Sequence, residues 1–156
     1  MIVNILKTMA QTEGGVVIQA SGTSMFPIIK SGDMLRVKYF QNYDVGDILV
    51  FTYKGGSLLV HRLLKIDNTI FFCKGDSSFR MEDINMERII GKVVEINGRR
   101  TTPPPESIMA LSLMVNTVFR KLKYDVASTK NSYIYRQYIK HLQTYYLRGQ
   151  YEEENL

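Results

Sequence analysis

Several protein classes are excluded by what this sequence lacks. Cys73 is the only cysteine in 156 residues, so no intramolecular disulfide can form. The two histidines, His61 and His141, are too few for the Cys and His clusters of a structural zinc site. No glycine-rich loop stands between a strand pattern and a helix pattern, so no nucleotide site is predicted. We therefore expect a protein without a metal or another cofactor.

Long apolar segments are also missing. The uncharged runs, such as residues 107–119, are short, and polar residues interrupt them. A membrane-spanning helix needs about 20 mostly apolar residues. The start of the chain lacks the apolar core and the cleavage site of a secretory signal peptide. These features predict a cytoplasmic protein without a transmembrane helix.

The positive charge is concentrated in the C-terminal third. The net charge is +5, and residues 106–151 contain seven Lys or Arg against two acidic residues, before the glutamates at 152–154. A solvated helix face explains this surplus most simply, and an anionic membrane surface is the alternative partner. No nucleic acid is expected, because the tyrosines of this region partly follow helical spacing.

The sequence changes character at residues 101–105 (TTPPP), because consecutive prolines end any strand or helix. We therefore predict a β-rich domain over residues 1–102 and a helical extension over residues 103–156. A short helix is expected over residues 2–11. Turn residues separate predicted strands at 16–18, 35–39, 48–53, 58–66, 69–73 and 89–96. This pattern predicts an α+β fold with a mostly antiparallel β domain.

Two helices are predicted after the prolines. Ile108, Leu111, Val115, Val118 and Leu122 recur at helical spacing and form one apolar stripe. A second stripe, rich in tyrosine, runs over residues 134–145. We expect these two helices to follow the β domain.

Ser24 is the candidate nucleophile. It lies in residues 21–27 (SGTSMFP), where a glycine permits a tight turn and a proline limits regular pairing. A nucleophilic serine needs such a fixed position and also a base, because a free hydroxyl is weakly nucleophilic at neutral pH. His61 is the only histidine of the β-rich part and interrupts an apolar strand, so it is the candidate base.

A neutral imidazole that acts as a base is best oriented by a carboxylate. The next predicted hairpin offers Asp76, and then Glu82 and Asp83. Each also has a structural explanation, because Asp76 could close a turn and the other two could solvate a loop. The residues leave the choice open, and we favour an aspartate, Asp76 or Asp83.

Five motifs in this order resemble the signal peptidase I family over about residues 16–100. They are Gly22-x-Ser24-Met25-x-Pro27, Gly32-Asp33, Gly46-Asp47 before an apolar run, Val60-His61-Arg62 and Lys74-Gly75-Asp76. Histidine at position 61, instead of the lysine of bacterial members, is similar to the endoplasmic-reticulum branch. The resemblance implies a serine peptidase in which Ser24 attacks the peptide bond and His61 is the general base.

The resemblance also implies how the transition state and the substrate are held. An oxyanion needs hydrogen-bond donors aimed at it, and the backbone N–H of the nucleophile is one candidate. Many family members carry a serine two residues before the nucleophile, where this chain has Gly22, and Thr23 or Ser21 is the candidate replacement. Met25 and Phe26 would help to form an apolar floor for the small residues that the family prefers before the cleaved bond.

The chain also departs from this family. Signal peptidases carry membrane anchors, so the chain resembles a compact, unanchored relative that removes leader sequences from a peptide or protein substrate. Self-cleaving SOS-type repressors share the Ser-Met turn, but they use a lysine base and cut an Ala-Gly or Cys-Gly bond that this chain lacks. Two alternatives stay open: an inactive peptide-binding module of the same fold, and a protein that binds an anionic surface through its basic helices.

Overall fold

The computed structural model describes residues 2–154, with side chains described for residues 2–147. The chain divides into two compact units, residues 1–103 and residues 104–156. The glutamate side chains of the predicted acidic tail, at residues 152–154, lie outside the described residues.

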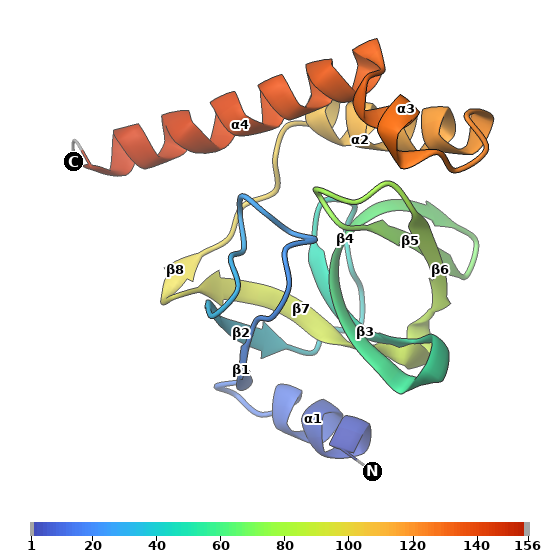
Figure 1. Cartoon of the computed structure of the whole chain (residues 1–156). Helices are drawn as coiled ribbons and strands as arrows, with labels where there is room; N and C mark the ends of the chain where they lie inside the picture. Colours follow the sequence, from blue (N-terminus) through green and yellow to red (C-terminus); the bar gives the residue numbers. More distant parts are fainter. Residues whose placement is uncertain (1, 155–156) are drawn as a thin grey trace. The chain divides into compact units, whose positions relative to one another are not determined.

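The N-terminal unit consists of one helix followed by an antiparallel sheet that curls into a half-barrel (Figure 1). The helix is α1 (Ile2–Ala10), and short 3-10 turns cover Lys54–Gly56 and Met86–Arg88. The strands are β1 (Val16–Gln19), β2 (Met34–Lys38), β3 (Ile48–Tyr53), β4 (Ser57–Asp67), β5 (Ile70–Lys74), β6 (Met81–Asn85), β7 (Ile89–Ile96) and β8 (Arg99–Arg100).

Strand β3 lies in the middle of the sheet order β1-β2-β7-β3-β4-β5-β6, and β8 pairs with β7. Ile48 and Val50 of β3 pack into one apolar core, and Leu49 and Phe51 pack into another. Successive side chains of a strand point to opposite faces, so β3 is buried on both sides. This double burial explains the uninterrupted apolar sequence of the strand.

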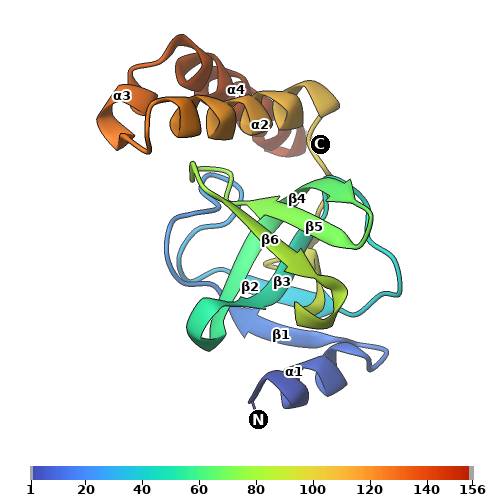
Figure 2. The ribbon, with the colours of Figure 1, turned by 90° about the vertical axis from the view of Figure 1, so that its right-hand side faces the viewer.

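Strands β4, β5 and β6 form a meander, which Figure 2 shows as three strands lying side by side. The register places Leu63 opposite Cys73, and Cys73 opposite Glu82. His61 precedes Leu63 by two residues and therefore lies on the same face of β4. The meander thus brings an imidazole and a carboxylate to one side of the sheet.

The predicted α+β fold is confirmed, with mostly antiparallel strands and helices at the C-terminal end. The helix expected over residues 2–11 is α1. The strand β6 (Met81–Asn85), which carries Glu82 and Asp83, was not predicted.

The C-terminal unit contains α2 (Glu106–Lys121), α3 (Val126–Lys130) and α4 (Tyr133–Glu154), and α2 packs against α4. The prediction of an apolar stripe on the first helix is partly confirmed. Ile108 and Val115 are buried, whereas Leu122 lies beyond the end of α2 and is exposed. The short helix α3 was not predicted. None of the helices in the described residues is both long and apolar enough to cross a lipid bilayer.

Candidate active site

The turn that carries Ser24 lies between β1 and β2. Gly22 has a φ of 84°, in the left-handed region that favours glycine. The amide of Phe26 donates a hydrogen bond to the carbonyl of Thr23 at 3.1 Å and closes the turn. The side chain of Met25 is buried in the first core and anchors this turn to the sheet. Ser24 is therefore held on a fixed segment.

His61 lies on β4, opposite Leu49 of β3. Only 6% of the residue is exposed, and its ring meets the ring of Phe51 edge-on, with 6.2 Å between the centroids. The Nε2 atom lies 3.0 Å from the Oγ of Ser24. A neutral imidazole with its proton on Nδ1 accepts the hydrogen of the serine hydroxyl at this distance. The strand therefore brings a base directly to the candidate nucleophile.

Glu82 contacts the other nitrogen of the same ring. Each of its carboxylate oxygens lies 2.9 Å from Nδ1 of His61, and only 8% of the residue is exposed. Burial alternates along β6, so that Glu82 and Ile84 face inward and Asp83 faces solvent. A carboxylate at Nδ1 keeps a proton there and leaves Nε2 as an acceptor. Ser24, His61 and Glu82 thus form one chain of contacts.

Neither aspartate favoured by the sequence occupies the place of Glu82. Asp83 is exposed, because it is the next residue along the alternating strand β6. Asp76 is buried, but its carboxylate accepts hydrogen bonds from Nε and Nη2 of Arg62, at 2.9 and 2.8 Å. The expectation of an aspartate at Nδ1 of His61 is therefore wrong, and a glutamate lies there.

The loop after β5 holds the nucleophile turn through its backbone. The amide of Ser77 donates to the carbonyl of Ser24 at 2.9 Å, and the Ser77 hydroxyl donates to the carbonyl of Thr23 at 2.6 Å. Gly75 passes so close that a Cβ there would lie 2.6 Å from the Ser24 carbonyl oxygen. A side chain at position 75 would push this loop away from the turn. The β5–β6 hairpin therefore supplies both the carboxylate and a clamp on the nucleophile.

Buried charges adjoin this loop. Arg62, Lys74 and Asp76 are each at most 2% exposed. Arg62 pairs with Asp76, and the Nζ of Lys74 donates to the carbonyl of Gly75 at 2.9 Å. Buried charges persist when they are paired or hydrogen-bonded. No role was predicted for Arg62 and Lys74, although a charged residue in an apolar strand is unusual and could have marked them.

Burial lowers the pKa of Lys74 from its ordinary value of 10.5 to about 8, although Asp76 and Glu82 oppose this change. Between about pH 8 and pH 10.5, Lys74 is still protonated in the unfolded chain but has lost its proton in the folded protein. The free energy of unfolding therefore rises with pH in this interval. We expect a rise of about 3 kcal/mol between about pH 8 and pH 10.5 from this residue. Urea unfolding of the wild type and of Lys74→Met measures it, and an equal pH dependence in both would contradict it.

The other predicted site residues surround the nucleophile. Within the described residues, the backbone N–H of Ser24 donates no hydrogen bond, so it is available to an oxyanion. Gly22 has open space beside its Cα, and Phe26 is half exposed. Substrate contacts of Thr23, Met25 and Phe26 stay predictions. The described part of the chain contains no group of three potential metal-ligating side chains.

A buried imidazole between a serine hydroxyl and a carboxylate is the arrangement by which serine peptidases activate their nucleophile. Residues 3–94 match the sequence model of a protein family described as Peptidase S24-like. The chain belongs to this family, and its fold is accordingly of the serine peptidase type. A comparison with curated proteins found no match.

Proposed function

We propose that the protein is a serine endopeptidase that cleaves polypeptides after small residues, with Ser24 as nucleophile and His61 as general base. The observation that carries this proposal is the 3.0 Å contact between Ser24 Oγ and His61 Nε2. The position of Glu82, 2.9 Å from Nδ1, supports the tautomer that this role requires. A buried base with a fixed tautomer is suited to proton transfer near neutral pH.

The proposed reaction begins when Ser24 Oγ attacks the scissile carbonyl carbon while its proton moves to His61 Nε2. The carboxylate of Glu82 stabilises the imidazolium that forms. The negative charge on the carbonyl oxygen is stabilised by the backbone N–H of Ser24. When the tetrahedral intermediate collapses, the C–N bond breaks and the leaving amine takes the proton from Nε2. Water then hydrolyses the acyl-enzyme with His61 again acting as the base.

The substrate class rests on the resemblance to signal peptidase I. That family prefers small residues before the cleaved bond, and the proposed substrate is a leader or signal-like segment in extended form. An extended peptide can bind beside a sheet as an additional strand. The exposed side chain of Phe26, two residues after the nucleophile, supplies apolar surface for such a segment.

A mixed peptide library read by mass spectrometry tests the proposal. We expect wild type to cleave after small residues, and Ser24→Ala and His61→Ala to reduce the rate by about 10⁴-fold or more. Ser57→Ala and His141→Ala are matched controls at exposed positions, and they should cleave like wild type. Equal cleavage by all variants would overturn the proposal. Absence of cleavage by wild type would favour the inactive peptide-binding module.

A further inference from the structure

The N-terminal unit contains a cleft of about 430 Å³. It opens between the start of β3, the strands β2 and β7, and the segment that follows β8. It is separate from the candidate active site in that Ser24, His61 and Glu82 do not line it. Its lining includes five cationic residues and two carboxylates: Arg36, Lys38, Arg62, Lys92, Arg100, Asp47 and Glu95.

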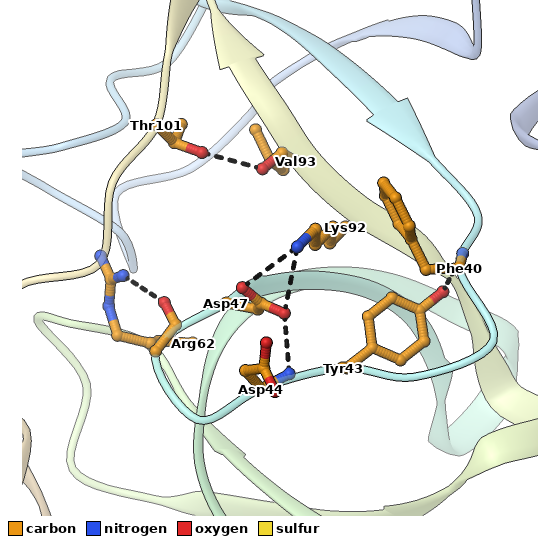
Figure 3. Close-up of polar contacts among 9 residues, drawn as sticks. Phe40, Tyr43, Asp44, Asp47, Arg62, Lys92, Val93 and Thr101 are labelled. Atoms are coloured by element: carbon orange, nitrogen blue, oxygen red, sulfur yellow. Dashed lines mark hydrogen bonds and ion pairs between the residues drawn. The ribbon is translucent and has the colours of Figure 1, made fainter. Parts of the chain in front are cut away.

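Two lysines of this cleft face each other across neighbouring strands. Lys38 of β2 is the register partner of Lys92 of β7. Like charges directly opposite each other in an antiparallel pair are destabilising. Asp47 offsets this repulsion only in part, because its carboxylate oxygens make long contacts of 3.4 and 3.5 Å with Lys92 Nζ (Figure 3). The Nζ of Lys92 also lies over the ring of Phe40, 4.7 Å from its centroid, in a cation–π contact.

The remaining cations differ in whether the protein already neutralises them. Arg62 is held by Asp76 and by the carbonyl of Gly46. Arg36 pairs with Glu95 at 3.1 Å. Lys38 and Arg100, by contrast, form no ion pair with any described residue. The cleft therefore keeps a positive surplus that a bound anion would neutralise.

The arrangement of the charges indicates the shape of that anion. Arg36 and Lys38 alternate on β2, so they share one face and are about 7 Å apart along the strand. Alternate side chains of any extended peptide have the same spacing. The cleft holds the volume of about 14 water molecules, which is much more than a single small ion needs.

Side chains, rather than main-chain pairing, must make the contacts. Thr101 covers the edge of β7 here. Its hydroxyl donates to the carbonyl of Val93 (Figure 3), and its amide donates to the carbonyl of Val94. That edge is therefore not available to an added strand. We propose that this cleft binds an extended acidic peptide segment with carboxylates at alternate positions. The binding goes beyond the proposed peptidase activity and does not require Ser24.

Fluorescence anisotropy with the full chain tests this binding. The probe is a peptide of alternating Glu and Ser carrying a neutral dye, and the comparison peptide has Gln in place of every Glu. The protein is used as wild type and as Ser24→Ala, so that loss of peptidase activity and loss of binding are read separately. We expect saturable binding of the Glu peptide to both proteins, weakened by salt, and little binding of the Gln peptide.

Charge-neutral variants locate the site. Lys38→Gln and Arg100→Gln should each raise the dissociation constant by about fivefold, and Lys38→Gln with Lys92→Gln by more than about tenfold. Lys65→Gln, on the exposed part of β4, is the matched control and should bind like wild type. Equal binding by all variants would overturn the proposal. Equal binding of both peptides, or displacement of the probe by inorganic pyrophosphate at peptide-like concentrations, would also overturn it.

Discussion

Replacing Glu82 by glutamine is expected to lower kcat for peptide hydrolysis by about 10³- to 10⁴-fold. The carboxylate contacts Nδ1 of His61 with both oxygens, and it stabilises the imidazolium that forms as the ring takes the serine proton. Glutamine keeps the shape but is neutral, and its N–H favours the opposite imidazole tautomer. Initial rates on a peptide that wild type cleaves give kcat and KM separately. The loss should fall on kcat, because the interaction strengthens in the transition state.

Asp83→Asn is the matched control for this experiment. It makes the same chemical change one residue further along β6, on the face that points to solvent. We expect its kcat to stay within about twofold of wild type, as for most exposed substitutions. An equal loss of kcat in both variants would show that Glu82 has no special role in orienting His61. Asp83 would then again be a candidate for that role.

Asp76→Asn is expected to lower the free energy of unfolding by about 3–5 kcal/mol, because it leaves the buried charge of Arg62 without its counter-ion. Both residues are 2% exposed, and two hydrogen bonds of 2.8 and 2.9 Å join them. Urea unfolding followed by circular dichroism measures the change. The variant should still unfold cooperatively, with a lower midpoint.

The exposed ion pair between Arg36 and Glu95 provides the matched control. One contact of 3.1 Å joins the two residues, and their side chains are 38% and 33% exposed. We expect Glu95→Gln to cost less than about 1 kcal/mol, because solvent screens such pairs. A cost equal to that of Asp76→Asn would contradict a special role for burial at Arg62.

The sequence pointed to Ser24 and His61, whose side chains lie 3.0 Å apart, but not to the carboxylate that contacts His61. A serine in a Gly-Pro turn and a histidine within an apolar strand are both unusual for their surroundings, so each could be selected without coordinates. The third residue depends on which side chains of β6 face inward. Its sequence, MEDIN, is mostly polar and does not look like a strand, so adjacent acids could not be separated. Only the pleat decides that Glu82 turns inward and Asp83 outward.

The residue at which α2 ends could not be predicted from the sequence either. An apolar stripe indicated the helix but ran one residue too far, and the chain turns after it at Lys123 and Tyr124, which have φ values of 55° and 65°. Many helices end on a glycine in this conformation, and lysine and tyrosine give no such signal. Asp125 then begins the short helix α3 by accepting a hydrogen bond from the amide of Ser128 at 2.7 Å.

The β5–β6 hairpin contributes both Glu82 and the clamp on the Ser24 turn, and it follows the other site elements in chain order. During synthesis from the N-terminus, Ser24 and His61 leave the ribosome before this hairpin does. A nascent chain that ends before Glu82 has the nucleophile and the base without the group that orients them. Under the proposed chemistry, the newly made protein gains its ability to cut peptides only when this part of the sheet closes.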